Sequence, residues 1–156
     1  MLQRIQSVYL LLASLAILAL FLFPLAHNVY VDNKPINITV IGVYQDVNGQ
    51  QQLTDHFVAL TAVTAIVGII PLIIIFLYKN RKQQIALCYS SVLVIIGYSF
   101  WIAQAAKAAT GGGVTLDFKN FGIGLFLCPL AILLHILAIK GIQRDEKLVK
   151  SADRLR

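Results

Sequence analysis

Side chains that could do chemistry are scarce in the apolar parts of this sequence. Four long apolar stretches contain no Asp, Glu, Lys or Arg, and His135 is the group within them that can gain a proton near neutral pH. Ionisable groups inside a membrane usually mark a transport or proton pathway, so His135, together with the polar Gln104, is the candidate for such a role. The simpler interpretation of His135 is a residue near the interface that bonds to a neighbour or to water.

The two cysteines do not predict a disulfide. On neighbouring membrane helices, Cys88 and Cys128 would differ in depth by about 12 Å at helical rise, which exceeds the reach of an S–S bond. We interpret both as small apolar side chains. Cys88 and His135 share a depth, but two ligands do not make a zinc site.

A metal site outside the apolar stretches also has little support. The groups that could form one are His27, His56, Asp55 and Asp117. Their spacing matches no known ligand pattern, and we expect them to be ordinary polar residues near helix ends. The sequence therefore predicts no catalytic residue, no metal and no cofactor.

The composition is that of a protein solvated mainly by lipid. Hydrophobic residues make up 58% of the 156 residues and charged residues only 13%, whereas a soluble domain needs about 25% charged residues. The net charge of +6 does not indicate nucleic-acid binding, because the basic residues lie beside apolar segments and no aromatic-basic strip is present.

The apolar runs predict four membrane-spanning helices, at residues 5–26, 57–78, 85–106 and 121–139. The first is 22 residues long, about 33 Å as a helix, and lacks the cleavage site of a signal peptide, so we expect it to be retained. Pro71 and Pro129 should kink the second and fourth helices. Hydroxyl groups and small residues within the spans predict close packing of a left-handed bundle.

Two segments connect these helices on the outer side, residues 27–56 and 107–120. Residues 36–44 alternate and are rich in β-branched side chains, Asn48-Gly49 is typical of a tight turn, and residues 50–54 would be the return strand. This pattern predicts a small β-hairpin. Residues 114–118 would add an edge strand to it.

The distribution of positive charge predicts the orientation. Ten of the 13 Lys and Arg residues lie in the amino-terminal segment, the connection at residues 79–84 and the tail at residues 140–156. By the positive-inside rule, both ends of the chain are therefore cytoplasmic.

The charged tail predicts a helix with two possible contacts. Leu148, Ala152 and Leu155 form an apolar stripe at helical spacing. The tail could lie along anionic lipid headgroups, or it could dock a cytoplasmic partner. The residues expected to make these contacts are Arg144, Asp145, Glu146, Lys147, Lys150, Asp153 and Arg154.

The two ends of the chain resemble a known family. The sequences MLQRIQSVY at residues 1–9 and GIQRDEKLVKSADRLR at residues 141–156 are similar to those of a four-span inner-membrane family of Bacteroidota, a domain of unknown function. The resemblance implies a location in the bacterial inner membrane and no activity. The plan is also similar to that of tetraspan adhesion proteins of the claudin type, but the tryptophan and cysteine pair of their first external loop are missing.

These observations predict an all-α membrane protein: a single four-helix transmembrane domain with a small external β-hairpin or sheet and a cytoplasmic carboxy-terminal helix. We expect a non-catalytic accessory or scaffold subunit that binds another membrane or envelope protein, or a second copy of itself, through its tail and external loops. A small transporter or channel, supported by Gln104, His135 and the two prolines, is the first alternative. An enzyme acting on lipid or quinone is the second, and it lacks a visible site.

Overall fold

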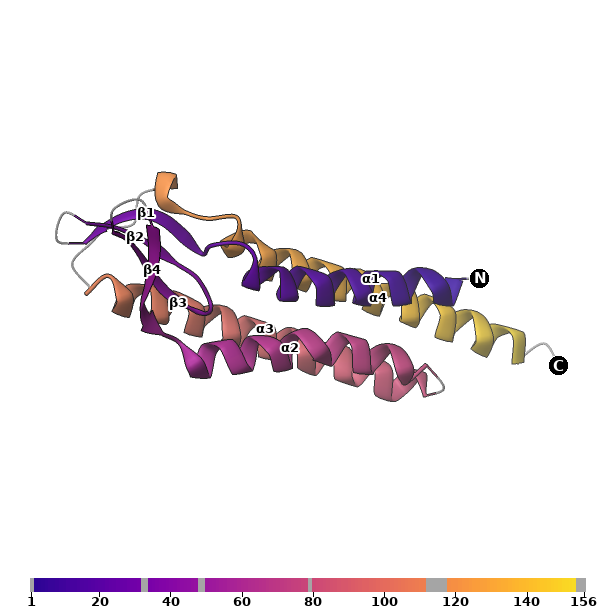
Figure 1. Ribbon diagram of the computed structural model, residues 1–156. Helices are drawn as coiled ribbons and strands as arrows, with labels where there is room; N and C mark the ends of the chain where they lie inside the picture. The colour runs from indigo at the N-terminus through magenta and orange to yellow at the C-terminus, as the bar shows by residue number, and fades with distance from the viewer. Residues whose placement is uncertain (1, 32–33, 48–49, 79, 112–117, 154–156) are drawn as a thin grey trace.

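The computed structural model describes residues 2–31, 34–47, 50–78, 80–111 and 118–153. Four α-helices form an elongated bundle in these residues, and a four-stranded antiparallel sheet covers one end of it (Figure 1). Both chain termini and the connection between the second and third helices lie at the opposite end. We call these the sheet end and the terminal end of the bundle.

Three helices are long and apolar enough to cross a membrane: α2 (Val58–Phe76), α3 (Arg81–Ala109) and α4 (Gly124–Asp153). They overlap the second, third and fourth predicted apolar segments. The predicted basic connection at residues 79–84 was too long, because α3 already begins at Arg81. Arg, Lys and Gln are good helix formers, so nothing in their propensity ends the helix earlier.

The first predicted span was wrong in its length. The helix α1 (Leu2–Leu18) continues as a 3₁₀ turn, η1 (Ala19–Phe21), and its apolar part, Ile5–Phe21, is shorter than the other three helices. Pro24 disfavours a helical conformation for the residue before it and lacks an N–H for the helical ladder. The chain then turns, and Ala26 begins a strand.

The predicted hairpin is confirmed, as part of a larger sheet. The strands are β1 (Ala26–Val31), β2 (Lys34–Ile38), β3 (Gly42–Val47) and β4 (Gln50–His56), in the order β1-β2-β3-β4. Val47 pairs with Gln50, which places the β3–β4 connection at residues 48–49, as the Asn-Gly pair predicts.

One predicted strand is in fact two. Residues 36–44 do not form one strand, because the chain turns at Thr39. The Thr39 hydroxyl accepts hydrogen bonds from the backbone N–H groups of Ile41 and Gly42, each at 3.2 Å, and so closes a local turn. Strand β1 was not predicted. The edge strand predicted at residues 114–118 falls almost wholly on residues 112–117, which lie outside the described part of the chain.

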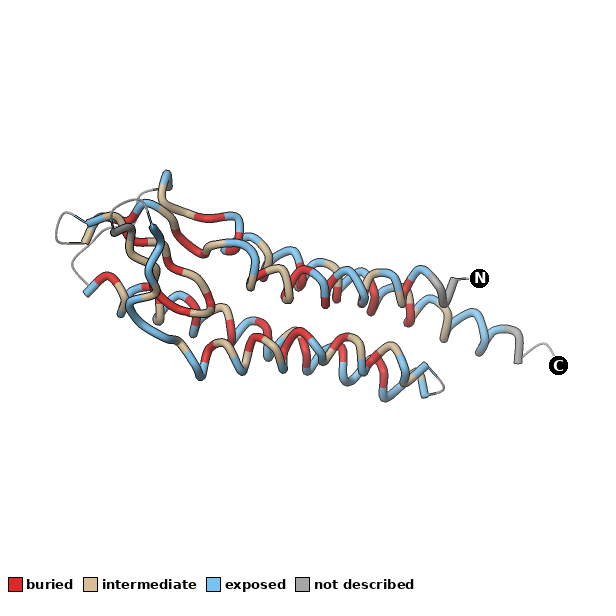
Figure 2. The backbone as a smooth tube through the Cα atoms, viewed as in Figure 1, coloured by how far each residue is buried: buried red, intermediate tan, exposed pale blue. Residues whose placement is uncertain are grey.

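The sheet and the helices share one hydrophobic core. Buried residues of the sheet, among them Val29, Ile38 and Val43, cluster with Leu20 of η1 and Tyr98 of α3. The helices place their buried residues toward one another and leave exposed residues on the outside (Figure 2). Many of the exposed side chains are large and apolar, as expected for helices that lipid surrounds.

The connection into α4 crosses the start of β1 at a very short distance. The backbone N–H of Gly122 donates to the Leu25 carbonyl at 2.9 Å, and that of Gly124 donates to the Pro24 carbonyl at 3.1 Å. A Cβ on Gly122 would lie 2.0 Å from the Pro24 carbonyl oxygen. Only glycine allows the two backbones to approach this closely.

Candidate functional site

The buried polar side chains of the bundle are hydrogen-bonded within the protein. Among the residues that the structure describes, no buried side-chain nitrogen or oxygen lacks a hydrogen-bond partner. Apolar surroundings make an unpaired polar group costly, so these contacts stabilise the bundle. They also leave fewer groups inside the bundle to bind a ligand.

His135 connects α4 to α3. Its ring is fully buried, with Nδ1 2.8 Å from the Ala131 carbonyl oxygen and Nε2 3.1 Å from the Ser91 hydroxyl. A carbonyl can only accept, so Nδ1 carries the proton, and in the neutral ring Nε2 accepts from Ser91. The pair resembles a serine–histidine dyad in composition, but both nitrogens are used within the protein. The hydrogen bond between His135 and Ser91 therefore joins α4 to α3.

Two further polar contacts join helices. The Ser14 hydroxyl of α1 donates to the Gly68 carbonyl of α2 at 2.6 Å, three residues before Pro71. Pro71 has no N–H to donate to the Val67 carbonyl, and the Ser14 hydroxyl binds the next carbonyl along the same helix. Thr64 of α2 shares a hydrogen bond with the phenol of Tyr98 of α3.

The other candidates inside the apolar helices do not form a site. Gln104 is exposed on α3, in contrast to the buried His135. Cys88 and Cys128 are both buried and free. Within the described ranges, no three His, Cys, Asp or Glu side chains are grouped so that they could hold a metal ion.

The charged residues of the tail continue α4 without a break. The helix ends at Asp153 and extends past the other helices at the terminal end (Figure 1), and Arg144, Asp145, Glu146 and Lys147 lie within its last ten residues. Lys150 and Asp153 belong to the same helix, but their side chains, and all of Arg154, lie outside the described part of the chain. The tail is therefore a helical extension of α4.

Contacts with two other helices fix the first turn of this extension. The Gln6 amide of α1 donates to the Asp145 carboxylate at 2.6 Å, and the Gln143 amide donates to the Tyr89 hydroxyl of α3 at 3.2 Å. Gly141 brings α4 close to α1, because a Cβ there would lie 2.8 Å from Cγ of Gln6. Sequence reasoning missed Gln6. Its signal was a polar residue at the second position of the first apolar run.

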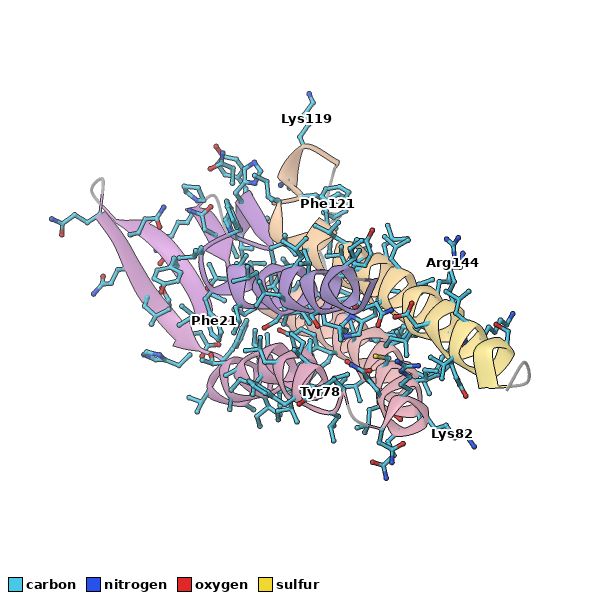
Figure 3. The ribbon with its side chains drawn as sticks, turned by 90° about the vertical axis from the view of Figure 1, so that its right-hand side faces the viewer. Phe21, Tyr78, Lys82, Lys119, Phe121 and Arg144 are labelled. Carbon is cyan, nitrogen blue, oxygen red and sulfur yellow. The ribbon has the colours of Figure 1, made fainter. Side chains whose placement is uncertain are left out.

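Two cavities lie at opposite ends of the bundle. The larger, about 330 Å³, is between the sheet and the end of α3 and is lined by Lys34, Gln45, Asp55 and Ala109, among others. The smaller, about 180 Å³, lies between α1 and α4 at the terminal end and is lined by Ile5, Gln6, Tyr9, Lys140, Gly141 and Arg144. Figure 3 shows Arg144 on α4 and Lys82 on α3 extending from separate helices at this end.

A comparison with family models finds one match, which covers residues 2–155 and is described as Domain of unknown function (DUF4293). No curated protein matches the sequence.

Proposed function

We propose that this chain, which belongs to the family Domain of unknown function (DUF4293), is a non-catalytic accessory subunit of the bacterial inner membrane. It crosses the membrane four times, keeps both termini in the cytoplasm, and binds another membrane or envelope protein through its tail helix and its external sheet.

The observation that carries the proposal is the helical extension of α4. A membrane span alone needs about 20 residues, whereas α4 has 30 and continues past the bundle with charged side chains. Lys147, Leu148 and Val149 are exposed on this extension, which Gln6 holds at its base. A continuous, partly apolar helix of this kind suits docking of a second protein.

The arrangement of the ends supports four crossings. Both termini and the α2–α3 connection lie at the terminal end, and the sheet lies at the other end (Figure 1). The sequence segments at the two termini and at this connection carry ten of the 13 basic residues. The apolar part of α1, Ile5–Phe21, has 17 residues, about 26 Å at helical rise, and hydrocarbon cores of about 30 Å can thin or receive snorkelling side chains to match. Its exposed Leu11, Leu12 and Leu15 suit contact with lipid.

A protease-protection experiment tests this topology. An epitope placed before Met1 should resist added protease in spheroplasts and become cleavable only after the membrane is permeabilised. In a Cys88→Ala/Cys128→Ala background, a cysteine at the exposed Gln51 should react with an impermeant maleimide from outside, whereas one at the exposed Ser151 should not. An epitope that is cut in intact spheroplasts would mean that α1 does not cross the membrane.

Partner binding is tested by affinity purification in a mild detergent after crosslinking in cells. We expect the tagged protein to retain a protein partner in fixed proportion. The Lys147→Glu/Lys150→Glu variant should reduce that partner at least about tenfold, because two charge reversals oppose any acidic contact.

The matched control for this experiment is Arg81→Glu/Lys82→Glu, which reverses two charges at the terminal end but outside the tail. It should retain the partner. A chain that is recovered alone in every detergent, or equal losses in both variants, would contradict the proposal.

The alternatives have less support from the contacts within the bundle. A transport pathway would use Gln104 and His135, but one is exposed and the other is bonded to Ser91 and Ala131. An enzyme acting on lipid or quinone would need a cluster of acid, base or metal-binding groups within reach of substrate. The two cavities described above lie at the ends of the bundle and do not include His135.

A further inference from the structure

The cavity between α1 and α4 at the terminal end has the chemistry of an anion site. Lys140 and Arg144 are four residues apart, so they lie on the same face of α4, one turn from each other. Tyr9 and Gln6, three residues apart, face them from α1. Two cations and two polar side chains from two different helices therefore line one space of about 180 Å³.

The nearby acidic groups form no ion pair with these cations in the described part of the chain. Asp145 accepts a hydrogen bond from the Gln6 amide at 2.6 Å, and Glu146 has an interaction as well. Among the described residues, no carboxylate pairs with Lys140 or Arg144. Both side chains are exposed, so they can reach a ligand in the cavity.

The position along the helix indicates which anion. Lys140 is the first charged residue after the apolar run of α4, so in the proposed topology it lies where lipid phosphates lie. Arginine binds phosphate oxygens through a planar fork, and lysine adds a point charge. Tyrosine is favoured at this level of a membrane, with its ring in the apolar region and its hydroxyl in the polar one.

We propose that this cavity binds a phosphate group, held by Lys140 and Arg144 of α4 with Tyr9 and Gln6 of α1 beside it. The cavity holds several water volumes of about 30 Å³, which is enough for a phosphate but not for a whole lipid. Ile5, 51% exposed at its edge, offers an apolar surface to acyl chains. The depth of this site in the membrane rests on the proposed topology. The arrangement of its charged side chains does not depend on that topology.

Binding is measured on the full-length protein purified in a nonionic detergent, at low salt, by titration calorimetry. The probes are dioctanoylphosphatidylglycerol, dioctanoylphosphatidylcholine and inorganic phosphate. We expect phosphatidylglycerol to bind more tightly than phosphatidylcholine. The Lys140→Gln/Arg144→Gln variant should bind phosphatidylglycerol at least about tenfold more weakly, as loss of charge-assisted hydrogen bonds predicts.

The control variant is Arg81→Gln/Lys82→Gln, which removes one arginine and one lysine at the same end of the bundle but outside the cavity. Its affinity should stay within about twofold of the unsubstituted protein. Equal losses in the two double variants, or equal affinity for the two lipids, would overturn the site. The conservative Lys140→Arg variant should keep most of the affinity, which separates loss of charge from damage to the fold.

The titration with inorganic phosphate shows whether the bound phosphate group comes from solution or from a lipid. If phosphate alone binds, displaces phosphatidylglycerol and depends on Lys140 and Arg144, the site is a phosphate site filled from solution. If phosphate does not compete, the ligand is a phospholipid. If no probe binds, the proposal fails. This result is independent of partner binding, because the purified protein is tested alone and Lys147 and Lys150 are unchanged.

Discussion

Replacing Gly122 with alanine should leave little folded protein. The new Cβ would lie 2.0 Å from the Pro24 carbonyl oxygen and 2.8 Å from the Pro24 carbonyl carbon. Both atoms are backbone, so no side-chain rotation can relieve the contact, and the start of β1 must move away from the start of α4. We expect a loss of roughly 3 kcal/mol or more in the free energy of unfolding. The unfolding midpoint in detergent, followed by the fluorescence of the single Trp101, measures it.

The matched control for this change is Gly97→Ala. Gly97 lies within α3, and a Cβ there would meet nothing within 4 Å. Alanine favours a helix over glycine by about 1 kcal/mol, so this variant should be as stable as the original or slightly more so. A Gly122→Ala variant that unfolds at the same midpoint as Gly97→Ala would show that the connection into α4 can move freely.

His135→Ala should destabilise the bundle by about 2–4 kcal/mol. The substitution removes a fully buried ring, which leaves a cavity, and it removes the contact with Ser91 that joins α4 to α3. The expected readout is a lower unfolding midpoint of the purified protein. Ser91→Ala should cost less, about 0.6–1.7 kcal/mol, because it deletes the hydrogen bond with little loss of volume.

Ser90 provides the control for the serine substitution. It precedes Ser91 on α3, is exposed, and bonds to the Ala86 carbonyl of its own helix at 3.1 Å. Ser90→Ala should therefore leave stability nearly unchanged. If Ser90→Ala and Ser91→Ala had equal effects, the contact between Ser91 and His135 would not contribute to helix packing.

The apolar runs predicted three of the helices well because lipid imposes a simple condition. A stretch of about 20 apolar residues can hydrogen-bond its backbone in lipid only as a helix, whatever its neighbours do. Val58–Phe76 departs from the predicted second span by one and two residues at its ends. The first helix departed further, because the apolar residues Leu25 and Ala26 are buried in the core that the sheet shares with the helices. Hydropathy does not distinguish these two ways of avoiding water.

The sheet was predicted only where local chemistry specifies it. Asn48-Gly49 fixed the position of the β3–β4 turn because few residue pairs adopt a two-residue hairpin connection. The first two strands depend on contacts far away in sequence. Asn28 adopts a positive φ of 51° at an irregularity in the β1–β2 register, and the Asn120 amide donates to its carbonyl at 3.2 Å. No periodic pattern in the sequence predicts a hydrogen bond between residues so far apart in the chain.

The candidate site, too, was predicted from the sequence only in part. The sequence identified Arg144 and its charged neighbours as a distinct tail, since a dense group of charges after an apolar helix is visible in one dimension. It did not identify Gln6 or Tyr9 as their companions, because these residues are more than 130 positions away. The packing of α1 against α4 at Gly141 brings them together.

The sequence alone determined that most of this chain avoids water, where three of its long helices lie, and which segments carry its positive charge. These are properties of composition along a segment, and the free energy of transfer into lipid is nearly additive over such a segment. The tertiary structure decided that the tail continues α4, that His135 joins α4 to α3, and that two cations share a cavity with a tyrosine. Each of these depends on which helices pack side by side, and that is set by close contacts at single residues such as Gly122 and Gly141.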